Sequence, residues 1–244
     1  MNQPETPSRL LHWCGRLALV FLVLVPLAVL AVRVGLVSYS IGLPVFALSC
    51  LGSLLILMVL AVASLLPAYK NQRRQALLKS LAAVPPVLLF GALLGSMGDY
   101  PPIHDVSTDP DDTPVFTSAG VKLRGEGSNG VEVNPEAIAI QREHYPDLTT
   151  IIVPQSSSEA FAQASAVAES LGWVIYNSDP HIGVLEASYS SFWFGFVDDI
   201  VIRIRPLDDD TGSEVDLRSV SRVGVGDLGA NARRIRAFSQ RLRE

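Results

Sequence analysis

Three long apolar runs dominate the first 98 residues, and polar residues are concentrated in the short stretches between them. The runs cover about residues 14–34, 42–66 and 79–98. A helix that spans a bilayer needs about 20 mainly apolar residues, so the pattern predicts three transmembrane helices. A cleaved signal peptide is the alternative for the first run. That run is longer than the usual apolar core of a signal peptide, and two more runs follow it.

From residue 134 onward, shorter periodic segments replace the long runs. Asn134 followed by Pro135 is typical of a helix start. Ser156 and Glu159 have the spacing of a capping box and open a second helix that ends before Gly172. Strands are predicted at residues 149–153, 173–177, 183–189, 197–205 and 214–222, with a turn over 208–213 and a final helix after Asp227. Hairpin-length connections favour antiparallel pairing. The predicted class is α+β, with helices packed on an antiparallel sheet.

Residues 99–133 separate the two patterns. The first half of this stretch is rich in Pro and Asp, and the second half contains the Gly-rich string GEGSNG. Such composition favours an extended linker, with a short strand around residues 121–123. We therefore expect three parts: a membrane anchor over 1–98, a linker and extended segment over 99–133, and a soluble α+β domain over 134–244.

Charge divides the chain at the same place. The net charge is −5, but residues 1–98 carry seven basic residues against one acidic, and the remainder carries 12 against 23. Overall, 49% of residues are apolar and only 18% are charged, which excludes a disordered chain or a simple soluble domain. The acidic half argues against nucleic acid as a partner, because phosphate backbones attract basic surfaces. The lipid bilayer is the expected partner of the apolar half.

The basic residues of the anchor also predict its orientation. Lys and Arg gather in the short loops that stay in the cytoplasm. The amino-terminal tail carries Arg9 and Arg16, and the stretch 67–80 carries four basic residues. With three spans, the sequence predicts a multi-pass inner-membrane protein with a cytoplasmic amino terminus and a periplasmic carboxy-terminal domain. Cys14 and Cys50 both lie in the membrane part, and a cysteine-free domain fits an oxidising compartment.

Five strings in the exported part together resemble a known family. They are PIHDVSTDP at 102–110, YPDL at 145–148, GW at 172–173, FVDDIVIRI at 196–204 and VDLRSVSRVGVGDLGANARRIRAF at 215–238. As a set they resemble the domain-of-unknown-function 1499 family of bacteria and plastid-bearing eukaryotes. The resemblance covers about residues 99–244 and leaves the membrane helices outside the domain. It implies a domain boundary and no particular activity.

Alternating charges on two predicted strands form the main candidate site. If the two strands pair, their charged faces adjoin, and the last helix borders them. Such a surface is either a salt-bridge ladder or a groove whose guanidinium forks bind a carboxylate or phosphate. The candidate residues are Asp199, Arg203, Arg205, Asp216, Arg218, Arg222, Asp227, Asn231 and Arg234.

An alternative polar site lies in the predicted linker at His104, Asp105, Ser107 and Asp109. The spacing of two between its oxygen-bearing residues resembles the start of a calcium loop. However, Pro110 stands where such a loop needs Gly, and Phe116 stands where it needs a bidentate Glu. Local capping of turns is the simpler interpretation. The sequence therefore predicts neither a metal nor a cofactor.

The remaining patterns do not indicate a reaction. Nucleophile elbows, zinc-protease motifs and phosphate-binding loops are missing from the sequence, and GVGDLG at 224–229 lies too near the end for a dinucleotide fold. An aromatic cluster at 192–196, beside Tyr189, suits a core, an apolar ligand wall or a membrane contact. We expect a binding or scaffolding module in the cell envelope, with an envelope protein or an anionic or acyl ligand as partner. The sequence leaves open whether the protein is an enzyme and favours a non-enzymatic role. The alternative is an envelope hydrolase or metal-dependent enzyme using His104, Asp105 and Asp109.

Overall fold

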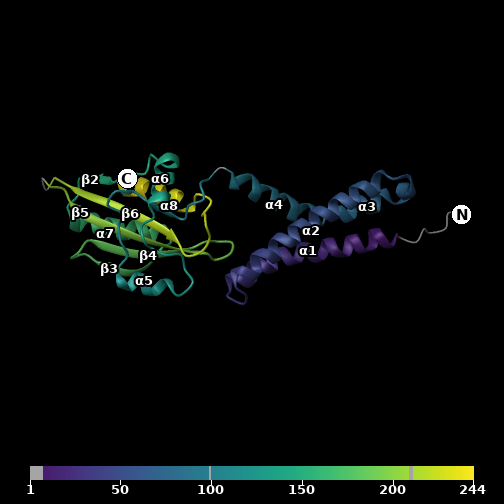
Figure 1. Cartoon of the computed structure of the whole chain (residues 1–244), viewed down its shortest axis with the longest axis horizontal. Coiled ribbons are helices and arrows are strands. Elements are labelled where there is room, and N and C mark those ends of the chain that lie inside the picture. Colours follow the sequence, from purple (N-terminus) through teal and green to yellow (C-terminus); the bar gives the residue numbers. More distant parts are fainter. Residues whose placement is uncertain (1–7, 99, 209–210) are drawn as a thin grey trace. The chain divides into compact units, whose positions relative to one another are not determined.

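A computed structural model of the chain describes residues 8–98, 100–208 and 211–244 (Figure 1). The residues outside these ranges include the first residue of the predicted linker and the centre of the turn predicted over 208–213. The chain forms two compact units, one of Met1–Met97 with Trp193–Gly195 and the other of Gly98–Phe192 with Phe196–Glu244.

The membrane unit contains two helices that are long and apolar enough to cross a bilayer. These are α1 (Arg9–Arg33) and α2 (Tyr39–Leu65). Small residues lie where helices pack: a Cβ on Gly42 would meet the side chain of Val32, and one on Gly52 would meet that of Phe21. Close approach at small residues is usual in membrane helices.

The third predicted span is a bent pair of helical segments. A 3-10 turn, η1 (Pro67–Gln72), leads into α3 (Arg73–Ser80), and α4 (Val84–Met97) follows at an angle of 56°. With 14 residues, α4 is about 21 Å long, which is short of a hydrocarbon core of about 30 Å. The described part of the chain therefore has two candidate spans, or three if the bent pair crosses as one.

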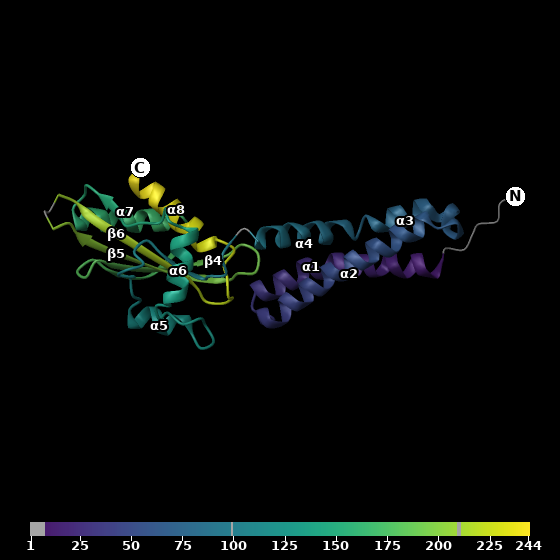
Figure 2. The ribbon, with the colours of Figure 1, turned by 45° about the horizontal axis from the view of Figure 1, so that its top comes forward.

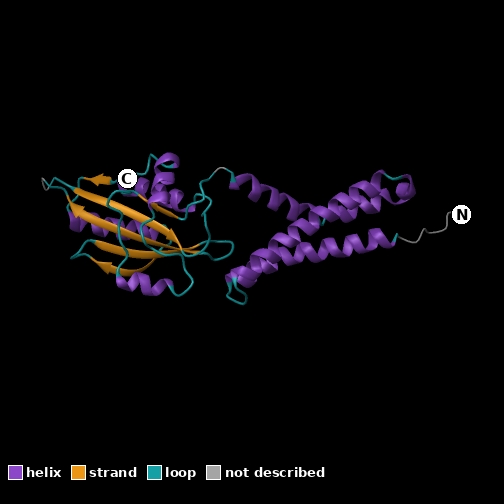
Figure 3. Ribbon diagram, viewed as in Figure 1, coloured by secondary structure: helices purple, strands orange, loops and turns teal. Residues whose placement is uncertain are grey.

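The soluble unit is an α+β domain built on an antiparallel sheet, as the sequence predicts (Figure 3). The sheet has the order β1-β6-β5-β4-β3, and β2 also pairs with β6. Its elements are β1 (Asp105–Ser107), α5 (Ser118–Arg124), α6 (Pro135–His144), β2 (Ile151–Val153), α7 (Ser157–Ser170), β3 (Val174–Asp179), β4 (Val184–Ser190), β5 (Val197–Pro206), β6 (Ser213–Ser221) and α8 (Ala230–Arg243).

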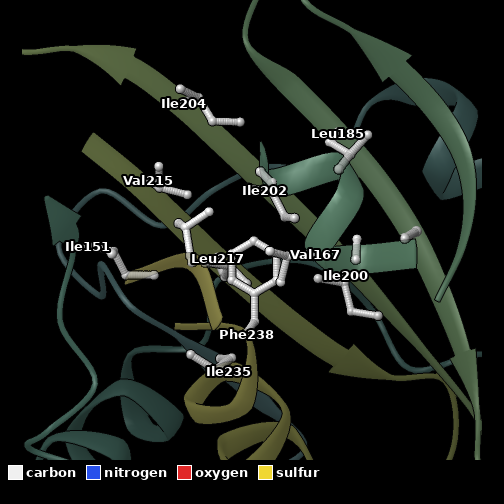
Figure 4. Close-up of a cluster of buried hydrophobic side chains, with 14 of the residues drawn as sticks. Ile151, Val167, Leu185, Ile200, Ile202, Ile204, Val215, Leu217, Ile235 and Phe238 are labelled. Atoms are coloured by element: carbon white, nitrogen blue, oxygen red, sulfur yellow. The ribbon is translucent and has the colours of Figure 1, made fainter. Parts of the chain in front are cut away.

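One face of the sheet, here called the inner face, forms the hydrophobic core under α7 and α8. Alternate residues of β5 and β6, such as Ile202 and Leu217, point toward this face and are fully buried. Phe238 of α8 lies among them in Figure 4, and its ring stacks on Trp173 at 5.4 Å. Because side chains alternate along a strand, the residues between these apolar ones face the other side of the sheet.

The opposite face, here called the outer face, carries Asp199 and Arg203 of β5 and Asp216 and Arg218 of β6. Helix α5 lies on the side of the sheet away from α7 and α8 (Figure 2). Val201 and Val220 on this face pack against Phe116, which precedes α5. The range expected as a linker therefore contains β1 and a segment that packs on the sheet. Residues 121–123 are helical rather than extended, because Thr117 caps α5 and Gly125, at φ +76°, ends it.

Candidate functional site

Asp199 of β5 is the centre of the outer face. Its carboxylate is fully buried and binds two guanidinium groups: Arg124 Nη1 lies 2.7 Å from Oδ2, and Arg222 forks onto both oxygens at 2.9 Å. The hydrogen bond to Asp199 raises the pKa of Arg222, whereas burial lowers the pKa of Arg124. One buried carboxylate thus holds together the sheet and the end of α5.

Asp216 of β6 forms a second cluster of ion pairs. It lies directly opposite Arg203 in the sheet register, and its Oδ2 is 3.1 Å from Arg203 Nη2 and 3.3 Å from Arg205 Nη2. Its Oδ1 accepts hydrogen bonds from the hydroxyls of Thr108 and Thr150. All the acceptor positions of this carboxylate are directed at groups of the protein itself.

Asp109 and Asp112 extend this cluster toward solvent. Both carboxylates lie within ion-pair distance of Arg203 and Arg205. The charge of Arg203, followed by the hydrogen bond from Arg205, lowers the pKa of Asp112. The predicted charged face is therefore brought together by the strands, and in the structure its opposite charges pair with each other.

The remaining arginine of the β6 ladder, Arg218, is paired with Asp105 on β1. Its other N–H groups donate to the backbone carbonyls of Pro114 and Val131, and the side chain has no exposed surface. Arg218 thus fastens the segment that crosses the outer face to the middle of the sheet.

The predicted residues of α8 lie on the inner side of the sheet. Asn231 accepts a hydrogen bond from Ser219 and donates to Ser221, so it bridges two alternate residues of β6. Asp227 caps the helix by accepting from the backbone N–H of Asn231, although burial raises its pKa. Arg234 pairs with Asp198 at 2.6 Å. These residues and the outer-face ladder occupy opposite faces and do not share one groove.

The alternative polar site does not converge on one cleft. His104 Nδ1 lies 3.2 Å from the carbonyl oxygen of Val225, whereas Asp105 and Asp109 pair with different arginines. Ser107 exchanges hydrogen bonds with the backbone of Asp109. Over the described part of the chain, no group of three or more His, Cys, Asp or Glu residues has a geometry that could hold a metal ion.

A shallow groove of about 310 Å³ lies between α8 and the start of β3. Trp173 and Tyr189 form its aromatic wall, and Arg233 and Arg234 of α8 border it. The guanidinium of Arg234 lies 4.9 Å from the centre of the Tyr189 ring, and that of Arg233 lies 5.3 Å from the centre of the Tyr100 ring. The groove therefore combines apolar surface with the guanidinium groups of Arg233 and of Arg234, and the charge of Arg234 is compensated by Asp198.

A family model described as a protein of unknown function (DUF1499) matches residues 105–242, which is more than half of the chain. The chain belongs to the DUF1499 family. The match begins at the first residue of β1 and ends at Leu242, the last buried residue of α8, so the DUF1499 domain includes the segment that covers the outer face. No curated protein matches the chain.

Sequence reasoning missed two groups inside the DUF1499 domain. The first is Arg124, which contacts Asp199 from a segment whose composition predicts a loop. Glu186 of β4 is fully buried with no cation paired to it among the described residues, and it accepts hydrogen bonds from Thr117 and Asn177. Only the alternation of side chains along β4 could have indicated a role for Glu186, because it places this residue on the same face as the charged residues of β5.

Proposed function

We propose that this DUF1499 protein is a non-catalytic binding module of the cell envelope. Its helices anchor it in the inner membrane with the amino terminus in the cytoplasm, and its α+β domain lies in the periplasm. There the domain binds an anionic amphiphile, a molecule with an acidic head and an acyl chain, in the groove beside α8.

The proposed orientation rests on where the basic residues lie. The η1–α3 segment carries Lys70, Arg73, Arg74 and Lys79, and all four are exposed or only partly buried. A cytoplasmic position for this segment agrees with the positive-inside rule and requires residues 81–97, which contain α4, to make the third crossing. A reporter experiment tests it. Alkaline phosphatase fused after Glu244 is expected to be active and a fusion in the 67–80 segment inactive; the reverse pattern would overturn the orientation.

The observation that carries the binding proposal is the composition of the groove. Leu171 and Ala237 offer apolar surface to an acyl chain, the buried Trp173 completes the lining, and the exposed guanidinium of Arg233 lies at the border. Among the described residues, no carboxylate lies within ion-pair distance of Arg233. Arg forks favour carboxylate and phosphate groups, so an acidic head next to an acyl chain matches both parts of the groove.

The basic character of α8 supports the same ligand class. The helix carries five arginines and no acidic residue between Ala230 and Arg243, although the half of the chain around it is acidic. Only Arg234 and Arg236 of these five form ion pairs among the described residues. The helix therefore provides a local positive surface in a domain that otherwise repels anions.

The outer face supplies the rigidity of the module in this proposal. Its carboxylates and guanidinium groups already pair with each other, and a ligand there would have to displace buried ion pairs. Breaking such a pair leaves an uncompensated charge, which is strongly unfavourable. The groove beside α8 needs no such displacement.

Binding is tested with the full chain in detergent, using dioctanoyl phosphatidylglycerol as the anionic probe and dioctanoyl phosphatidylcholine as its zwitterionic partner. Titration calorimetry is expected to show tighter binding of the glycerol lipid. Arg233→Glu should weaken the binding of phosphatidylglycerol about tenfold or more, which corresponds to a loss of roughly 1.4 kcal/mol in binding free energy. Ala237→Trp, which fills the groove, should weaken the binding of both lipids.

Arg142→Glu is the matched control, because Arg142 is an exposed arginine whose ion-pair partner, Asp111, is also exposed. This variant should bind like the parent chain. Equal affinity for the two lipids, or an unchanged affinity after Arg233→Glu, would overturn the proposal.

A further inference from the structure

The β4–β5 hairpin ends in an aromatic tip. Backbone hydrogen bonding between Ser191 and Phe196, at 2.8 Å, closes the loop, and the Ser191 hydroxyl accepts from the Phe196 N–H at 2.9 Å. Four residues remain in the tip, and three of them are aromatic. Hairpin tips in water are usually built from Gly, Asn, Asp and Pro, so this composition is unusual for a solvated turn.

Two of these aromatic side chains expose most of their surface. Phe192 is 73% exposed and Trp193 is 61% exposed. Trp and Tyr are enriched where proteins meet the membrane–water interface, and exposed Trp and Phe side chains favour the same region. Exposure and residue type together point to a lipid surface rather than to bulk water.

The tip lies at the end of the sheet where the chain enters the domain. The N–H of Ser221 donates to the carbonyl of His104, just before β1, and the N–H of Arg222 donates to the carbonyl of Val197, at the base of the hairpin. His104, Ser221 and Val197 thus stand side by side on three neighbouring strands. Two strand spacings are about 10 Å, so the entry point and the hairpin base are close within the domain.

The connection to the membrane helices is short. α4 ends at Met97 and β1 begins at Asp105. This connecting segment, here called the tether, has eight residue steps and spans at most about 30 Å when fully extended. Since the chain before Met97 is apolar enough to lie in the bilayer, the entry end of the domain stays near the lipid surface in any orientation that the tether allows.

A second loop at this end also exposes an apolar side chain. Val225, in the loop from β6 to α8, is 77% exposed. The loop is held against the entry segment, because the N–H of Asp227 donates to the carbonyl of Ile103. Apolar side chains from two adjacent loops are therefore presented at the same end of the sheet.

From this juxtaposition we infer that the hairpin tip, through Phe192 and Trp193, inserts into the interfacial region of the bilayer that carries the protein's own helices. The domain is then held by two attachments, the tether and the tip, which restrict its rotation. The inference needs only a lipid surface and does not depend on a ligand in the groove beside α8.

Ile182 provides a matched control position. It lies in the β3–β4 turn at the opposite end of the same sheet, and its exposure of 61% equals that of Trp193. The two native cysteines are buried, so a Cys14→Ala/Cys50→Ala background accepts a single labelled cysteine. Full-length chains carrying Trp193→Cys or Ile182→Cys are labelled with the polarity-sensitive dye NBD and placed in phosphatidylcholine nanodiscs.

The label at position 193 should emit at shorter wavelength and be quenched by shallow doxyl lipids at least about twofold more than the label at 182. Equal quenching at both positions would overturn the inference. Shielding of position 193 from iodide without quenching by the lipid would also overturn it, because protein would then cover the tip.

A second measurement keeps the native tryptophan in place. In a Trp13→Phe chain the remaining tryptophans are the buried Trp173 and the exposed Trp193. Brominated phosphatidylcholine should quench this chain, and the further substitution Trp193→Phe should remove most of the quenching. Undiminished quenching after that substitution would contradict insertion of the tip.

Discussion

Arg218 of β6 and Asp105 of β1 form a fork-to-fork ion pair inside the domain, with Nε 2.9 Å from Oδ1 and Nη2 2.7 Å from Oδ2. The two residues are 113 positions apart in the chain. Because the Arg218 side chain has no exposed surface, its charge depends on Asp105 and on two backbone carbonyls for compensation. The pair fastens the entry strand to the sheet.

Replacing Arg218 by Met should destabilise the protein strongly. Removing one partner of a buried pair leaves the other charge uncompensated, and the expected loss of unfolding free energy is about 3–5 kcal/mol. Denaturant unfolding of the full chain in detergent, followed by tryptophan fluorescence, measures it. Arg142→Met, at an exposed pair, should cost less than about 1 kcal/mol. Equal losses of unfolding free energy for the two variants would show that the buried pair stabilises the protein no more than the exposed pair does.

Gly183 and Gly125 allow the effect of crowding to be separated from that of backbone strain. Both have positive φ, at +66° and +76°, but a Cβ on Gly183 would lie 2.2 Å from the carbonyl oxygen of Ile204, whereas one on Gly125 would meet nothing within 4 Å. Gly183→Ala should therefore lower the melting temperature more than Gly125→Ala does. Thermal melts of the two full-length variants check this, and the reverse order would refute the assigned geometry of the β3–β4 turn.

Tyr176 should make the protein sensitive to alkaline pH. Burial, followed by the charges of Asp199 and Glu186, raises the pKa of its phenol well above the ordinary value. For a raised pKa, the stabilisation is fully present below the unfolded-state value of about 10 and is lost as the pH rises above it. Unfolding of parent and Tyr176→Phe chains, compared at pH 8 and pH 10.5, should show a smaller alkaline loss in the variant.

At neutral pH the same substitution should be nearly neutral, because the buried Tyr176 hydroxyl has no hydrogen-bond partner among the described residues. Tyr145, whose pKa burial also raises, serves as a comparison. If Tyr176→Phe leaves the alkaline loss unchanged while Tyr145→Phe reduces it, the sensitivity belongs to the other tyrosine.

Phe238→Ala tests the core between α8 and the sheet. The ring is fully buried and stacks on Trp173. Truncation of a buried Phe typically costs about 3–5 kcal/mol, because the cavity closes only in part. Fluorescence unfolding should show this loss together with a changed native emission of Trp173. Val174→Ala, at a side chain that is 66% exposed, should change neither quantity much.

Local signals in the sequence predicted the helices and strands of the domain well. The capping box of Ser156 and Glu159 is present in the structure, and α7 ends before Gly172, which has φ +75°. The alternation in β5 and β6 also predicted that Arg203 and Asp216 would share a face, and they stand directly opposite each other. Such features depend on residues within a few positions, so a single sequence contains them.

Distant pairings could not be predicted in the same way. β1 has three residues and is a strand only because β6 lies beside it, more than 100 positions later. Arg124 is separated from Asp199 by 75 positions, and nothing near either residue indicates the other. The predicted polar surface is therefore an interior layer, covered by a segment that resembles a linker.

The bent third span shows a further limit. Hydropathy over 79–98 predicted one helix, but three non-helical residues separate α3 from α4, and two prolines stand at the start of α4. Proline removes a backbone donor and disturbs the preceding turn, so the helix axis changes direction there. A hydropathy profile measures apolar content and carries no information on this break.

The pairing of β1 with β6 has a consequence for the order of assembly. The entry strand and the segment over the outer face are synthesised before their partners, Asp199 of β5 and Arg218 of β6. Arg124 has no native partner until β5 emerges, and Asp105 has none until β6 emerges, so the outer layer cannot close before then. The domain therefore closes only after β6 has been synthesised, and a chain that stops before β6 leaves its entry strand unpaired.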